Sequence, residues 1–173
     1  MSHESIPIDE HVRLIQLQPE QADRLFELTD QNREYLGQFL PWPPYVKSVD
    51  DSKKHIEETI QKRIEDSSYT YGIEVDGVIA GDVSIRNLNE AEKTPEIGYW
   101  MAPDYAGKGL MTKAVQGLTA YGLDSLGLEK IIIRAEPTNI GSNKVAEKAG
   151  YIQAGQDVEH DKTLNVWSIS NPA

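Results

Sequence analysis

The sequence predicts an α/β protein with one mixed, mostly antiparallel, twisted sheet of about seven strands and helices on both faces. Three observations support this fold class. Apolar residues alternate as in strands through the middle of the chain, and they recur at helical spacing on either side of it. One strand–helix–strand unit is expected from Pro95 to Ala135. A chain of 173 residues suits one ordinary domain, which we expect to span residues 11–170.

The N-terminal part is predicted to form one strand followed by three helices. These elements are expected at Val12–Leu17, Glu20–Thr29, Arg33–Leu40 and Ser48–Asp66. Pro19 suits the first turn of a helix, and Ser48 followed by Asp51 resembles a capping box. The prolines of Pro41-Trp42-Pro43-Pro44 forbid a continuing helix and predict a stiff, extended segment with exposed aromatic side chains.

The rest of the chain is predicted to contain six strands and two helices. The strands are expected at Tyr69–Val75, Val78–Leu88, Pro95–Met101, Leu128–Ala135, Tyr151–Val158 and Thr163–Ile169, with helices over residues 109–127 and 139–149. Asp76-Gly77 supplies the positive φ angles of a two-residue hairpin turn. In the second of these strands, the alternating residues predicted to share one face are Ile79, Gly81, Val83 and Ile85.

Composition narrows the possible chemistry. The chain has no cysteine, which excludes disulfides, thiolate zinc sites and a cysteine nucleophile. The four histidines, for which we expect surface positions and no metal site, are His3, His11, His55 and His160. A net charge of −11 and a pI near 4.8 argue against nucleic-acid binding and favour a cationic partner. The sequence shows no leader peptide and no apolar run of membrane-spanning length, so we expect a cytoplasmic protein that binds no membrane.

The most informative segment is Met101–Thr112, where a strand ends, Gly107 and Gly109 flank Lys108, and a helix begins. Glycines there let successive backbone N–H groups converge beside the positive end of a helix, which suits a pyrophosphate. A Walker loop would need Ser or Thr where Gly109 stands, and a dinucleotide-binding loop would need a third glycine at Thr112. An ordinary tight strand-to-helix turn is the remaining alternative.

Three motifs occur in a fixed order along the chain: Glu96-Ile-Gly-Tyr-Trp-Met, then Gly107-Lys-Gly-Leu-Met-Thr, then Asn139-x-x-Ser142-x-x-Val145-x-x-Lys148-x-Gly150-Tyr151. Together they resemble the GNAT N-acetyltransferase superfamily, and more narrowly its RimJ/RimL-type branch of ribosomal-protein N-terminal acetyltransferases. The early segments Arg33-x-Tyr35-Leu36 and Phe39-Leu40-Pro41-Trp42 are also similar to that branch. The resemblance covers roughly Val12 to Ile169, and it implies the GNAT fold with acetyl-CoA as acyl donor.

The resemblance also implies how acetyl-CoA is held. The family loop Gln/Arg-x-x-Gly-x-Gly/Ala aligns with Asp104 to Gly109, and the acid Asp104 departs from it, so its carboxylate should point away from the pyrophosphate. The strand before this loop should splay from the next strand and offer its backbone to the pantetheine arm. Asn139 corresponds to a family residue at the pantetheine region, and its alternative role is a helix N-cap. The expected cofactor-binding residues are Tyr99, Trp100, Met101, Ala106, Gly107, Lys108, Gly109, Leu110, Met111, Asn139 and Ser142.

Two residues are the first candidates for catalysis. Glu96 is the expected general base, because several GNAT enzymes carry a glutamate there; the alternative is a structural carboxylate paired with Arg86 or Arg134. The other candidate bases are Glu136, Glu159 and Asp161. Many GNAT enzymes protonate the leaving thiolate with a tyrosine where this chain has Ala146, so Ser142 is expected to hydrogen-bond the thiol instead.

The expected reaction is direct acetyl transfer from acetyl-CoA to a primary amine, first of all the N-terminal α-amino group of a ribosomal or other protein. Such a group has a pKa of about 7.7–8.0, against about 10.4 for lysine, so it needs less help to lose its proton. The acceptor groove is expected beside Trp42, Tyr45 and Val49–Asp66. A polyamine or antibiotic acetyltransferase and a noncatalytic acyl-CoA-binding domain are the alternatives, and the sequence is compatible with a monomer or a homodimer.

Overall fold

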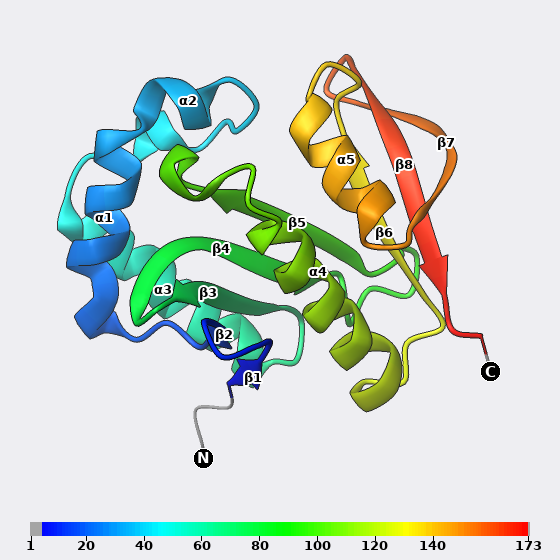
Figure 1. Ribbon diagram of the computed structural model, residues 1–173, viewed down its shortest axis with the longest axis horizontal. Helices are drawn as coiled ribbons and strands as arrows, with labels where there is room; N and C mark the ends of the chain where they lie inside the picture. Colours follow the sequence, from blue (N-terminus) through cyan, green and yellow to red (C-terminus); the bar gives the residue numbers. More distant parts are fainter. Residues whose placement is uncertain (1–4, 173) are drawn as a thin grey trace.

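The computed structural model describes residues 5–172, which form an eight-stranded sheet with the order β1-β2-β3-β4-β5-β6-β8-β7 (Figure 1). The strands are β1 Ile6–Pro7, β2 Val12–Ile15, β3 Tyr69–Val75, β4 Val78–Arg86, β5 Glu96–Met101, β6 Lys130–Ala135, β7 Ile152–Glu159 and β8 Lys162–Ser170. Neighbouring strands are antiparallel except β5 and β6, which are parallel. The predicted fold class is confirmed, and the short β1 is an addition to it. His3 lies outside the described residues.

Helices cover both faces of this sheet, as predicted (Figure 1). They are α1 Ala22–Gln31, α2 Arg33–Gly37, α3 Val49–Ile64, α4 Leu110–Ala120 and α5 Ile140–Lys148. The larger core lies under α4 and α5 and includes the fully buried Leu118 and Ile131. The smaller core lies under α1 and α3 around Leu25 and Ile56.

The predicted alternation along β4 is wrong at one residue. Val83 and Ile85 pack in the larger core, whereas Ile79 packs in the smaller core on the opposite face. The register between β3 and β4 shifts there, because Ile73 pairs with Gly81 while the next residue pairs with Ile79. A bulge of this kind inserts one residue and therefore sends the residues beyond it to the other face.

The strands β5 and β6 touch only at their beginnings. Among the described residues their register pair is Glu96 with Ile132, and the Ile132 N–H donates to the Pro95 carbonyl at 2.9 Å. Farther along, the two strands diverge, so the β6-facing edge of β5 has no strand partner from Ile97 to Met101. This confirms the predicted splay, and it leaves backbone groups in the middle of the sheet available to a ligand.

The proline-rich segment is a tight turn rather than the extended strip that the sequence predicts. Pro43–Tyr45 form one turn of 3₁₀ helix. Arg33 holds this turn, because its guanidinium donates to the Pro43 carbonyl at 2.8 Å and to the Val46 carbonyl at 2.6 Å. Tyr45 is 77% exposed, as predicted, but Trp42 turns inward and packs against Trp100 with ring centroids 5.4 Å apart. A guanidinium distant in sequence therefore sets the shape of this turn.

Ser48 caps α3, as the sequence predicts. Its hydroxyl accepts a hydrogen bond from the Asp51 N–H at 3.3 Å, and α3 begins at Val49. Ser48→Ala is therefore expected to lower the free energy of unfolding by about 1 kcal/mol, because one N–H of the first turn loses its acceptor. Urea denaturation measures the change, and Ser48→Asp is the control that retains an acceptor. An equal loss in both variants would contradict the capping role.

Candidate active site

A groove of ≈ 470 Å³ follows the end of β5, the start of α4 and the first turns of α5. Ten of the residues predicted to bind the cofactor line it: Tyr99, Trp100, Met101, Ala106, Gly107, Gly109, Leu110, Met111, Asn139 and Ser142. The predicted Lys108 is exposed and is not part of this lining, and the same is true of Asp104. All but one of the residues predicted from the sequence to bind the cofactor therefore lie in the lining of this groove.

The loop before α4 requires glycine at two positions because of its backbone conformation. Gly107 and Gly109 both have φ of 76°, and a Cβ added to either would meet no atom within 4 Å. Glycine is thus needed at both positions for the left-handed backbone and not for space. The first helical bond of α4 runs from the Lys113 N–H to the Gly109 carbonyl at 3.1 Å. The N–H groups just before Lys113 have no partner within the helix, which suits an anionic group such as a pyrophosphate.

Two lysines supply charge to the groove from α5. Lys144 and Lys148 line it, and they are one helical turn apart on the same side of α5. The residues predicted from the sequence to bind the cofactor include Lys108 but neither of these two lysines. The sequence does contain a signal for them, because Lys144 and Lys148 are four residues apart in the helix predicted to follow Asn139 and so lie on one side of it. In a chain of net charge −11, this local positive charge favours an anionic ligand at close range.

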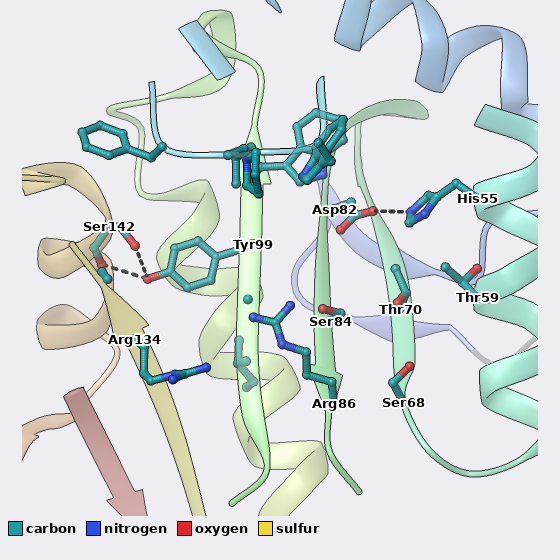
Figure 2. A pocket seen from close by; sticks show the side chains of 18 of the residues that line it. His55, Thr59, Ser68, Thr70, Asp82, Ser84, Arg86, Tyr99, Arg134 and Ser142 are labelled. Carbon is teal, nitrogen blue, oxygen red and sulfur yellow. Dashed lines mark hydrogen bonds and ion pairs between the residues drawn. The ribbon is translucent and has the colours of Figure 1, made fainter. Parts of the chain in front are cut away.

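A second cavity, of ≈ 630 Å³, meets the groove at the point where β5 and β6 diverge. Residues of α3, β3, β4, β5 and β6 line it (Figure 2). The residues that line both spaces are Phe39, Leu40, Tyr99, Trp100, Asn139 and Ser142. We call this second cavity the acceptor cleft, and Trp42 borders it, as the sequence predicts. Reactants held in the two spaces would meet at Tyr99 and Ser142.

Tyr99 and Ser142 form a pair of hydrogen bonds at this junction (Figure 2). The Tyr99 hydroxyl donates to the Ser142 carbonyl at 2.8 Å, and the Ser142 hydroxyl donates to the Tyr99 oxygen at 3.0 Å. Burial raises the pKa of the Tyr99 phenol to about 12, so the phenol keeps its proton at neutral pH. Sequence reasoning predicted Tyr99 as a cofactor contact and missed its hydroxyl, because the partner lies on another element.

Glu96 is buried between Arg86 and Arg134, two arginines that line the acceptor cleft, and is not itself part of the lining. Only 4% of its surface is exposed. Arg134 donates from Nε to both carboxylate oxygens at 3.2 Å, and Arg86 donates from Nη2 to Oε2 at 3.4 Å. This geometry is the one expected if Glu96 is a structural carboxylate paired with Arg86 and Arg134. Proton abstraction by Glu96 would compete with these ion pairs, and the base role stays a prediction.

The other predicted bases are also near cations or outside the cleft. Glu159 Oε2 lies 2.9 Å from Arg134 Nη1, and Glu136 Oε2 lies 3.6 Å from Lys162 Nζ; both glutamates line the cleft. Asp161 lies in the β7–β8 turn with φ of 64° and is not part of the lining. Arg134 therefore pairs with both Glu96 and Glu159, whereas Glu136 lies near Lys162.

Asn139 takes the capping role that the sequence predicts as one of two possibilities. Its side chain accepts a hydrogen bond from the Ser142 N–H at 3.3 Å and so caps α5. Because Asn139 also lines both cavities, the cap fixes the position of Ser142 at their junction. A cofactor contact by Asn139 stays a prediction.

His55 is exposed, as the sequence predicts, and it also lines the α3 wall of the acceptor cleft. Its side chain is 49% exposed, and Nε2 lies 3.9 Å from Oδ2 of Asp82, whose side chain is only 10% exposed (Figure 2). Pairing with Asp82 raises the pKa of His55 above its ordinary 6.5. The sequence signal for this pair is Asp82, an acidic residue within the otherwise mostly apolar strand β4, which requires a polar or cationic partner.

Within residues 5–172, no cluster of three or more His, Asp or Glu side chains has an arrangement that could hold a metal ion. In the same part of the chain, every helix is too short or too polar to cross a membrane.

Comparison with known proteins gives matches along most of the chain. The family model described as acetyltransferase (GNAT) domain matches residues 11–152. Bacillus subtilis (strain 168) YdaF is 32% identical over 150 residues, which cover 86% of this chain and 82% of YdaF. The ribosomal-protein-serine acetyltransferase of Escherichia coli (strain K12) is 28% identical over 152 residues, covering 88% and 85%. The crystal structure of the microcin C7 self immunity acetyltransferase MccE, in complex with acetyl-CoA and AMP, matches with a TM-score of 0.88 and 25% identity over 94% of both chains.

Proposed function

The chain belongs to the acetyltransferase (GNAT) domain family, and from this premise we propose that its acceptor is the N-terminal α-amino group of a protein, first of all a ribosomal protein. The protein is an acetyl-CoA-dependent N-acetyltransferase of the ribosomal-protein acetyltransferase type. Similarity to a ribosomal-protein-serine acetyltransferase over 88% of the chain supports the proposed acceptor. We further propose that residues 11–170 form one N-acetyltransferase domain.

The observation that carries this proposal is the meeting of the two cavities at Tyr99, Trp100 and Ser142. A donor in the groove and an amine in the acceptor cleft would approach each other there without a covalent enzyme intermediate. The chain has no cysteine to form such an intermediate. The arrangement therefore supports direct transfer, in which the protein contributes mainly positioning and stabilisation of charge.

The groove has the features that a CoA thioester requires. Acetyl-CoA supplies an acetyl group that is already activated as a thioester. The N–H groups at the start of α4, with Lys144 and Lys148, would hold the phosphates. The free edge of β5 would pair with the extended arm in the manner of an added strand. The lining residues Met101, Leu110 and Met111 give this part of the groove its apolar character.

We assign stabilisation of the leaving sulfur to the Tyr99–Ser142 pair. Both hydroxyls lie where the cavities meet, and Ala146 has no polar group for this task. A thiol of ordinary pKa, about 8.5, is a stronger acid than a phenol whose pKa is raised to about 12. Tyr99 therefore keeps its own proton, and its O–H stabilises negative charge on sulfur when it turns from the Ser142 carbonyl to donate to the sulfur.

The proposed function predicts that acetyl-CoA stabilises the protein and that Gly109→Glu abolishes this effect. A ligand at about 100 times its Kd adds about 2.7 kcal/mol to the free energy of unfolding, which appears as a rise in Tm. Mass spectrometry should detect an added acetyl group on a peptide with N-terminal serine, and the Gly109 variant should lose this activity. A glutamate there would place a carboxylate where the phosphates are expected.

Gly77→Glu is the matched control, because Gly77 also has a positive φ and open space around its Cα, but lies in the β3–β4 turn. It should keep both the Tm shift and the activity. Acetylation of spermidine but of no peptide would instead favour a small-amine acceptor. Binding of acetyl-CoA without acetylation of any amine in a broad panel would favour a noncatalytic domain.

A further inference from the structure

The wall of the acceptor cleft formed by α3 and β4 carries a His–Asp pair, on the side of the cleft away from Tyr99 and Ser142 (Figure 2). Asp82 is opposite Trp100 in the β4–β5 register, so the two side chains project from the same face of the sheet. Trp100 lines both cavities. The Asp82 carboxylate is therefore a cross-strand neighbour of the place where donor and acceptor would meet.

Asp82 differs in its partner from three carboxylates that lie in or beside this cleft, Glu96, Glu136 and Glu159. Glu96 and Glu159 lie against Arg134, and Glu136 lies near Lys162, so each of these three carboxylates is paired with an arginine or a lysine. Within the described part of the chain, the ion pair of Asp82 is with His55. Histidine loses its charge near neutral pH, and a nearly buried carboxylate then attracts another cation.

The spacing of the pair suits a bridging ammonium group. The 3.9 Å between His55 Nε2 and Asp82 Oδ2 is too long for a direct hydrogen bond. A nitrogen placed at about 2.8 Å from each atom, the usual length of a charge-assisted hydrogen bond, would donate to both at once. We propose that His55 and Asp82 form the acceptor-amine site, in which Asp82 binds the ammonium group and His55 removes its proton. This inference rests on the proposed function and names the groups that act on its acceptor.

The proton balance is simple. One N–H bond of the ammonium breaks and a bond from His55 Nε2 to hydrogen forms, so the electron pair stays on the amine nitrogen. That nitrogen bonds to the acetyl carbon as the carbon–sulfur bond breaks, and the sulfur leaves with the bonding pair. The nitrogen, now cationic, loses a second proton to form the amide, and this proton passes to the sulfur. His55 is half exposed, so it returns its proton to water. An α-ammonium group with a pKa of about 7.7–8.0 and a histidine with a raised pKa are close enough for this exchange.

The charged groups around His55 set the direction of its pH response. Asp82 on β4 and Glu58 on α3 raise its pKa, while Lys62 on α3 lowers it; Arg86 on β4 lines the same cleft. The neutral imidazole is the proton acceptor, so activity should fall as pH drops through the raised pKa of His55. Once protonated, His55 pairs with Asp82 directly, and the site loses both acceptors for the substrate.

His55→Gln tests this proposal. With a peptide carrying N-terminal serine, kcat/KM for the peptide should fall about 10- to 100-fold near pH 7 and recover toward pH 9, where the free amine is neutral without help. The acetyl-CoA-dependent rise in Tm should stay unchanged. Asp82→Asn should raise KM for the peptide and move the acidic limb of the kcat/KM profile to lower pH, because His55 loses its anionic partner.

His11→Gln is the matched control. His11 forms a second His–Asp pair, with Nδ1 2.7 Å from Asp76 Oδ1, but both side chains are more than half exposed and neither lines the cleft. This variant should keep the wild-type pH profile. A His55→Gln enzyme within about twofold of wild type at every pH would overturn the proposal, since a general base contributes far more than that.

A binding measurement separates this inference from the proposed function. In proton NMR of the wild-type protein with CoA, the ring resonances of His55 should shift when the serine peptide or spermidine is added, while those of His11 should not. If neither probe is acetylated but the His55 resonances shift, the ammonium site stands and the proposed function fails. If the His55 resonances stay unchanged with both probes, the ammonium site is wrong.

Discussion

Glu96→Gln is expected to lower the free energy of unfolding by about 3 kcal/mol, the lower end of the usual cost of breaking a buried ion pair. Glu96 is 4% exposed and accepts hydrogen bonds from Arg134 and Arg86. Without its charge, the largely buried Arg134 guanidinium keeps only the exposed partners Asp157 and Glu159. Arg86 is half exposed and can be rehydrated, which limits the loss. Urea denaturation of the two proteins measures the difference.

Glu74→Gln is the matched control for this prediction. Glu74 also sits on a strand and accepts hydrogen bonds from an arginine, Arg13, at 2.8 and 3.1 Å, but Arg13 is 53% exposed. A pair with that exposure contributes about 1 kcal/mol or less. Equal losses in the two variants would contradict the structural role of Glu96. A Glu96→Gln protein of unchanged stability with no turnover would favour the base role instead.

Tyr99→Phe is expected to lower kcat about 100-fold, with little change in KM for acetyl-CoA. The phenol is the donor that we place beside the leaving sulfur, and removal of one such donor commonly costs a factor of about 10² to 10³. Ser142→Ala should have a smaller effect, because it removes the hydroxyl that donates to the Tyr99 oxygen but leaves the Tyr99 O–H as a donor for the sulfur. Steady-state kinetics with a serine-initiated peptide gives both constants.

Tyr151→Phe is the control for the loss of a buried phenol. The Tyr151 hydroxyl is hydrogen-bonded to Thr119 at 2.6 Å and lines neither the groove nor the acceptor cleft. This variant should lose stability while its kcat stays near that of wild type. If Tyr99→Phe kept the wild-type kcat, or if both variants lost kcat equally, stabilisation of the sulfur by Tyr99 would be wrong.

The sequence predicted the helices and strands well where local chemistry determines them. Ser48 caps α3, and Gly107 and Gly109 adopt the left-handed backbone for which glycine is suited. These features depend on backbone angles and on groups within one helical turn. The predictions were wrong where a distant group intervenes. Arg33 draws the proline-rich segment into a turn, and the bulge in the β3–β4 pair moves Ile79 to the other face.

The sequence by itself determined the order of the elements, the absence of thiols and the glycine loop before α4, since these reside in residue identity and short-range spacing. The tertiary structure alone decided which side chains act together. It placed Glu96 against Arg134, Tyr99 against Ser142, and His55 beside Asp82. Such pairs join residues from different elements, whose distance is set by strand register and by packing across the sheet. No pattern within a single segment encodes that distance.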